Sequence, residues 1–155
     1  MIFAQPTRTI PLLLPGTLAT NATATAIIDT LGYDYLTVEV VQGASVATNS
    51  SARWASLFLS EGDTTTAASS VNIPAFIGTT NTSATSGFVI QPNNNNTTGI
   101  VQKLFVSLLG RRRYVFLNAQ PHQTNSAVYA KAELSRAEQS PNTDANRNIA
   151  GSVIG

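Results

Sequence analysis

Apolar and polar residues alternate along most of the chain with the two-residue period of β-strands. The clearest case is residues 101–119, where two alternating runs are joined by Gly110 and three consecutive arginines. Glycine tolerates the backbone of a tight turn, so this stretch predicts a β-hairpin with Arg111, Arg112 and Arg113 at its bend. We expect this hairpin to form the centre of a sheet.

Further strands are predicted, each bounded by turn residues, at 24–28, 34–42, 53–60, 71–77, 87–91 and 126–136. Pro74 cannot donate a backbone hydrogen bond, so the strand at 71–77 is expected at a sheet edge. Residues 29–32 are expected to form the turn between the first two of these strands. Seven or eight short strands without helical periodicity predict an all-β protein: a single β-sandwich (jelly-roll-like) domain over residues 24–136.

Extended arms are predicted on both sides of this domain. In residues 1–23, Pro6, Pro11 and Pro15 exclude a regular helix and interrupt any central strand. This N-terminal arm either packs along its own domain or docks on a neighbour, since it carries more apolar surface than a disordered tail, including Phe3, Ile10, Leu12, Leu13 and Leu14. Residues 137–155 are polar up to a small apolar end and predict a second arm.

Composition narrows the classes of protein that remain. The 155 residues suit one domain, and 43% hydrophobic residues are enough to bury a core. Only 11% of residues are charged and the net charge is +1, which argues against an ordinary nucleic-acid-binding protein. Cysteine is absent, and we recognise neither a signal peptide nor a membrane-spanning stretch. We therefore expect a protein that is made in the cytoplasm and is soluble there, or is assembled there into something larger, without a membrane as partner.

Side chains suited to catalysis or metal binding are few. His122 is the one histidine, and the sequence offers it neither an orienting carboxylate nor a nucleophile. Glu61 and Asp63 flank a glycine like ligands of a calcium loop, but two carboxylates are too few for such a site. A pair of carboxylates acting as in glycosidases is the weakest of the functions considered. We expect no catalytic residue, no metal and no cofactor.

Two features of the sequence allow both a structural and a functional interpretation. Arg111, Arg112 and Arg113 form either a solvated turn, a contact with an acidic patch on a partner protein, or a phosphate contact. Trp54, with the tyrosines, suits either the core or a sugar-binding platform of the kind that β-sandwiches host, and its apolar strand favours the core.

The order of the sequence segments adds a resemblance to these observations. IIDTLGYDYLTVEVVQGAS is followed by LFLSEGDTTT, NIPAFIG, KLFVSLLGRRRYVFLNAQP and AVYAKAEL. This succession, over residues 24–134, resembles a group of small β-sandwich proteins of tailed bacteriophages that are encoded near the major capsid protein. Some of these proteins serve as head cement or decoration proteins. The most specific segments are residues 29–34 and 112–114.

The resemblance implies a structural virion protein on the exterior of the capsid. Its partners would be the major capsid protein and further copies of itself, with a trimer favoured, and it would stabilise contacts between capsomers. The candidate partner-binding residues are those of the N-terminal arm and of the arginine bend: Phe3, Ile10, Leu12, Leu13, Leu14, Arg111, Arg112 and Arg113. The alternative is a glycan- or receptor-binding module of a phage tail or fibre.

Overall fold

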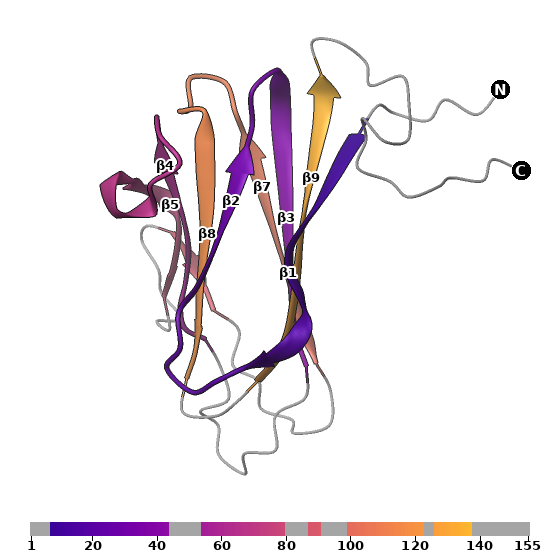
Figure 1. Cartoon of the computed structure of the whole chain (residues 1–155), viewed down its shortest axis with the longest axis vertical. Helices are drawn as coiled ribbons and strands as arrows, with labels where there is room; N and C mark the ends of the chain where they lie inside the picture. Colours follow the sequence, from indigo (N-terminus) through magenta and orange to yellow (C-terminus); the bar gives the residue numbers. More distant parts are fainter. Residues whose placement is uncertain (1–6, 44–53, 80–86, 91–98, 123–125, 138–155) are drawn as a thin grey trace, which may run out of the picture.

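The computed structural model describes residues 7–43, 54–79, 87–90, 99–122 and 126–137. Over these residues the chain forms two facing β-sheets (Figure 1) and one short 3-10 helix, η1 (Ala67–Ser69). The strands are β1 (Thr7–Leu18), β2 (Ala24–Asp29), β3 (Tyr33–Gln42), β4 (Trp54–Gly62), β5 (Val71–Thr79), β6 (Phe88–Val89), β7 (Ile100–Ser107), β8 (Tyr114–Pro121) and β9 (Ser126–Ala137). No helix in the described ranges is long and apolar enough to cross a membrane. The predicted all-β sandwich is confirmed.

The strand order is that of a jelly roll. The first sheet has the order β1-β9-β3-β7, and the second sheet has the order β2-β8-β4-β5-β6. The antiparallel pairs join the first strand to the last, β2 to β8, β3 to β7 and β4 to β5. Such nested pairs arise when one long antiparallel ribbon is wound into two sheets, and β6 adds a short parallel extension at Gly78 and Thr79 of β5.

The predicted hairpin at residues 101–119 is wrong. β7 is the edge strand of the first sheet, whereas β8 lies inside the second sheet between β2 and β4. The bend at Gly110 (φ 74°) therefore carries the chain from one sheet to the other. The bend between β2 and β3, with Gly32 at φ 81°, does the same at the same end of the sandwich.

The structure also differs from the expected N-terminal arm. Residues Thr7–Leu18 are strand β1, which pairs with β9 along the edge of the first sheet. Pro11 is tolerated because an edge strand needs hydrogen bonds on one side only, and the register shifts between Pro11 and Leu13 and again before Gly16. Residues 1–6 and 138–155, which include Phe3 and the predicted C-terminal arm beyond Ala137, lie outside the described residues.

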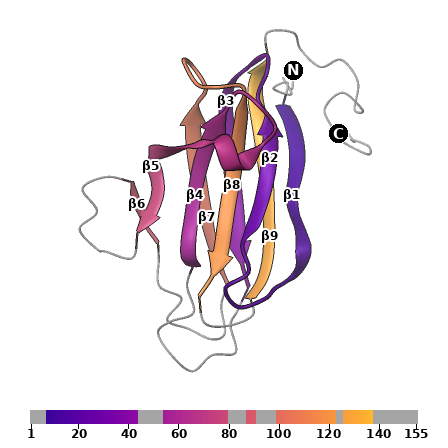
Figure 2. The same cartoon turned by 60° about the vertical axis from the view of Figure 1, so that its left-hand side comes forward.

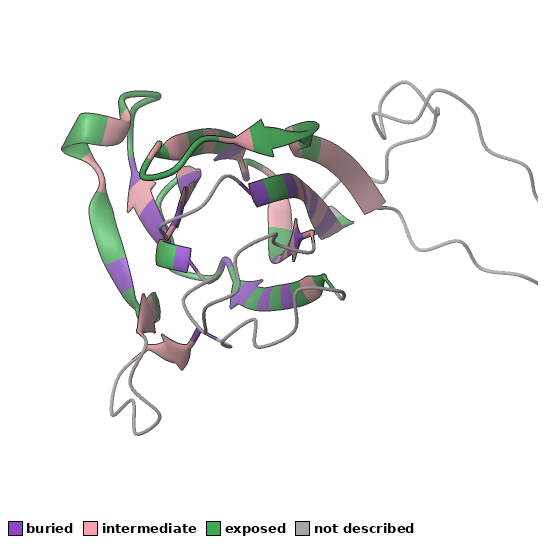
Figure 3. Cartoon of the chain, turned by 90° about the horizontal axis from the view of Figure 1, so that it is seen from below, coloured by how far each residue is buried: buried purple, intermediate pink, exposed green. Residues whose placement is uncertain are grey.

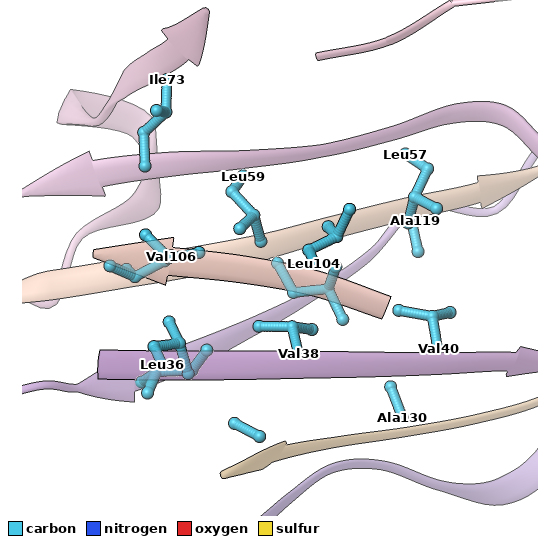
Figure 4. Close-up of a cluster of buried hydrophobic side chains, with 14 of the residues drawn as sticks. Leu36, Val38, Val40, Leu57, Leu59, Ile73, Leu104, Val106, Ala119 and Ala130 are labelled. Carbon is cyan, nitrogen blue, oxygen red and sulfur yellow. The ribbon is translucent and has the colours of Figure 1, made fainter. Parts of the chain in front are cut away.

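The core lies between the two sheets. Seen end-on, the buried residues line the inner faces (Figure 3), and Figure 4 shows side chains from both sheets meeting there. Leu36, Val38 and Leu134 of the first sheet and Leu57 and Leu117 of the second are at most 1% exposed. Trp54 is 1% exposed in the same cluster, which places it in the core and not on a sugar-binding platform.

The outer face of the second sheet is partly covered by the chain, whereas the outer face of the first sheet carries exposed aromatic residues. Ser70 Oγ donates a hydrogen bond to Ser60 Oγ at 2.9 Å, which holds the segment that carries η1 against the outer face of the second sheet. Figure 2 shows η1 in front of the ends of β4 and β8. Phe116 points outward from β8 and is nevertheless 1% exposed. On the first sheet, Tyr35 and Phe105 point outward and are 42% and 70% exposed.

Candidate functional site

The three arginines lie at the end of the sandwich where the chain crosses between the sheets. Arg113 donates two hydrogen bonds to Asp29, from Nε to Oδ1 at 3.0 Å and from Nη2 to Oδ2 at 2.8 Å. Its guanidinium also lies 4.9 Å from the centre of the Tyr114 ring. The bidentate geometry ties the end of β2 to the start of β8, and it lowers the pKa of the Asp29 carboxyl below its ordinary value.

The other two arginines contact the end of β4. Arg111 Nη1 lies 3.3 Å from Glu61 Oε1, and Arg112 Nη1 lies 3.0 Å from Asp63 Oδ2. The backbone N–H of Arg112 donates to Glu61 Oε2 at 3.2 Å. We call Arg111, Arg112, Arg113 and their three carboxylate partners the ion-paired rim.

The ion-paired rim reduces the charge that the three arginines offer to an acidic partner. Each arginine is matched by one carboxylate of its own chain, so the cluster carries little excess positive charge for a phosphate or an acidic partner. The side chains of Arg112 and Arg113 are still 45% and 46% exposed. Their docking on a partner stays a prediction, and an acidic partner would compete with Asp63 and Asp29. Glu61 and Asp63, the two carboxylates of the calcium loop considered above, instead pair with Arg111 and Arg112.

The described apolar residues of the expected arm fall into two groups, those that pack on their own domain and one that is exposed. Ile10, Leu12 and Leu13 pack against the core cluster of their own domain. Leu14 follows the register shift and is 75% exposed. It lines a pit of about 140 Å³ with Leu18 of β1 and Val128 of β9. Of the two placements considered for the arm, packing on its own domain holds for these residues, and Leu14 alone among the four is left for a partner.

The outer face of the first sheet carries exposed apolar residues that the sequence analysis did not single out. On β7, Val101 and Phe105 are 55% and 70% exposed, and Leu109 just beyond it is 90% exposed. A hollow of about 350 Å³ lies beside Phe105 and is bordered by Tyr35 of β3. The signal was present in the sequence, because Lys103 and Ser107 share the parity of Val101 and Phe105 and mark that side of β7 as solvent-facing.

Acidic side chains in the described ranges are largely engaged in ion pairs. Besides the rim, Glu39 Oε2 lies 2.9 Å from Lys103 Nζ, and Asp34 Oδ2 lies 3.6 Å from Arg136 Nε. The hydrogen bond from Lys103 lowers the pKa of the Glu39 carboxyl, the opposite of what a general acid requires. Within these ranges, no three side chains of His, Cys, Asp or Glu gather closely enough to hold a metal ion.

Comparison with known proteins adds no assignment. No protein-family model matches the chain, and no curated protein matches it by sequence.

Proposed function

We propose that the chain is a structural virion protein, a capsid cement or decoration protein that binds the outer surface of an icosahedral phage head and stabilises contacts between capsomers. The observation that carries the proposal is the jelly-roll strand order over the segments that bear the resemblance, residues 24–134. Jelly rolls recur in viral capsid and lectin domains. The proposed partners are the major capsid protein and further copies of this chain.

Such a role requires a rigid body and repeated weak contacts, without chemistry. The ion-paired rim ties β2, β4 and β8 together at one end of the sandwich, which supports rigidity. Many copies on a symmetric lattice multiply weak contacts into stable occupancy. Cofactors, nucleic acid and membranes have no part in the proposed mechanism.

The candidate contact residues now have distinct roles. Leu14 is exposed and can touch the capsid directly, as can Arg112 and Arg113 if they exchange their carboxylate partners. Ile10 and Leu13 face the core, so they act by holding β1 in place and thereby positioning Leu14.

The test is binding to heads assembled from the major capsid protein in the absence of this chain. We expect the purified protein to co-sediment with these heads until a fixed number of copies is bound, and a map of the decorated particles to show it on the exterior. Leu14→Asp should weaken binding without unfolding the protein, whereas Val71→Asp, at an apolar residue that is 55% exposed on the other sheet, is the matched control. Folded protein that stays in the supernatant at every ratio would refute the proposal.

A deletion of residues 1–21 does not test capsid binding by the N-terminal residues alone, because it would remove strand β1 and expose β9. Loss of capsid binding by that variant would then report a damaged sandwich. A deletion that stops before Thr7 leaves all described strands intact and tests the first six residues alone.

A second candidate function is glycan binding, which the hollow between Tyr35 and Phe105 favours. Exposed aromatic rings beside a shallow hollow are suited to stacking against a sugar. This function predicts saturable binding in a glycan screen that Tyr35→Ala abolishes. A screen without hits, combined with co-sedimentation with heads, would exclude it in favour of the capsid role.

A further inference from the structure

The edges of the two sheets are not equally protected against pairing with another chain. β1 carries Pro11 and two register shifts, and β6 is only two residues long. β2, six residues long, lies against β1 across the corner of the sandwich. β7 is eight residues long and contains neither proline nor glycine, and its pairing with β3 shows no register shift. Exposed regular edges are the ones that accept a further strand.

The backbone of β7 offers unpaired hydrogen-bonding groups along this edge. Leu108 N–H donates to the Asp34 carbonyl of the β3 side at 2.8 Å. Hydrogen-bonding direction alternates along an antiparallel pair, so the even-numbered residues of β7 bond to β3. The N–H and C=O groups of Val101, Lys103, Phe105 and Ser107 therefore point to the open side, where no strand of the described residues pairs with them.

The side chains of the same residues are exposed on the outer face. β7 alternates between buried and exposed residues along its length, as the purple and green stripes show in Figure 3. Val101, Phe105 and Leu109 are 55%, 70% and 90% exposed, and they recur every four residues. Lys103 and Ser107 lie between them.

We propose that β7 pairs with β7 of a second copy, antiparallel and about a two-fold axis at Phe105. In this register Phe105 lies opposite Phe105 of the second copy, and Val101 lies opposite Leu109 of the second copy. The exposed apolar residues Val101, Phe105 and Leu109, the last of which lies just beyond the end of β7, then each meet an apolar residue, and Lys103 meets Ser107. The two first sheets join into one continuous sheet that crosses the interface.

Self-complementarity is the reason for choosing a second copy over an unrelated peptide. A two-fold contact requires that residues equally spaced about the axis suit one another, and the spacing of Val101, Phe105 and Leu109 meets this requirement. Charge does not oppose the contact, because Lys103 is already paired with Glu39 at 2.9 Å. A shift by two residues would place Lys103 opposite Phe105 of the other copy and lose the match.

This contact goes beyond the proposed function and holds whether or not the protein binds a capsid. It predicts a dimer, in contrast to the trimer that the resemblance favours. Failure of capsid binding leaves the dimer intact, and failure of the dimer leaves capsid binding open, so the two proposals are tested separately.

The absence of cysteine from the chain makes a direct test of register possible. In the proposed pairing, Lys103 and Ser107 of the second copy have Cα atoms about 5.5 Å apart, within the range that a disulfide spans. The double variant Lys103→Cys/Ser107→Cys should therefore form a covalent dimer on mild oxidation. In each single variant the two cysteines are about 13 Å apart along the strand and should remain unlinked.

A second measurement uses the exposed aromatic ring. Phe105→Asp places two carboxylates at the axis and should convert the dimer seen by sedimentation velocity into a monomer with unchanged circular dichroism. Val71→Asp, at an apolar residue of the second sheet that is 55% exposed, is the matched control, and it should leave the dimer intact. A monomeric or trimeric wild-type protein, cross-linking of the single variants as fast as of the double variant, or a Phe105→Asp dimer would each overturn the proposal.

Discussion

Replacement of Thr30 by valine tests the connection between the two bends that cross from sheet to sheet. Thr30 is 6% exposed. Its hydroxyl donates to the Arg113 carbonyl at 2.6 Å, and its backbone N–H donates to the same oxygen at 3.0 Å. Both bonds join the β2–β3 bend to the β7–β8 bend, which is distant from it in sequence.

The expected loss follows from this geometry. A buried neutral hydrogen bond contributes about 0.5–1.5 kcal/mol, and valine has nearly the shape of threonine, so no cavity forms. The Arg113 carbonyl keeps its bond from the Thr30 N–H and is not left without a donor. We therefore expect Thr30→Val to lower the free energy of unfolding by about 1 kcal/mol, which corresponds to a fall of about 2–4 °C in the melting temperature.

Urea unfolding measures this difference. The midpoint should fall while the slope of free energy against urea stays unchanged, because the variant unfolds to expose the same surface. Thr25→Val is the control, since the Thr25 hydroxyl donates to Asn118 Oδ1 at 3.0 Å in an exposed setting, and we expect a loss below about 0.5 kcal/mol. Equal midpoints for the two variants would contradict the role of the Thr30 bond in holding the bends together.

Three further predictions concern stability. Because the Arg113 pair lowers the pKa of Asp29, the stabilisation of the fold by this pair is present above the ordinary pKa near 3.8 and is lost as the pH falls through the folded-state pKa. Asp29→Asn should thus be less stable than wild type at pH 7 and similar to it in strong acid, as urea midpoints at several pH values would show. Trp54→Ala should cost about 3–5 kcal/mol, measured in the same way, because the side chain is 1% exposed; a loss below about 1 kcal/mol would place it outside the core. Gly78→Ala should also destabilise the fold, by about 1–3 kcal/mol, since the added Cβ would lie 2.5 Å from the Leu57 carbonyl oxygen, and a neutral result in thermal unfolding would contradict this packing.

Most strands could be predicted from the sequence because each alternates strongly enough to fix its own periodicity. The strand predicted at 34–42 is Tyr33–Gln42, and the one predicted at 126–136 is Ser126–Ala137. β5 lies between β4 and β6 in the sheet order, but β6 pairs only with Gly78 and Thr79, so residues 71–77, which include Pro74, are paired on one side only within the described part of the chain. Alternation of apolar and polar residues indicates which face of a strand is buried, and it can be seen from the residues of that strand alone.

Which strands are neighbours could not be predicted in the same way. A glycine with positive φ between two alternating runs suits a hairpin within one sheet and a bend between two sheets equally well, and Gly110 is the second case. Only long-range contacts distinguish the two, such as the bond between Thr30 and Arg113. The same limit explains why the arginines were considered as docking residues, since their partners Asp29, Glu61 and Asp63 are distant in sequence.

The ion-paired rim and the β7 edge therefore differ in which existing interactions a partner would have to replace. A partner that binds Arg113 must replace a bidentate carboxylate at 2.8 and 3.0 Å, and each new ion pair is offset by the loss of an existing one. A partner that binds β7 satisfies backbone groups with which no described strand pairs, and it covers Phe105, which is 70% exposed. Because association is favoured where no existing bond must first be broken, the β7 edge is the stronger candidate for a contact of this protein. The ion-paired rim instead links the ends of β2 and β4 to the segment that leads into β8.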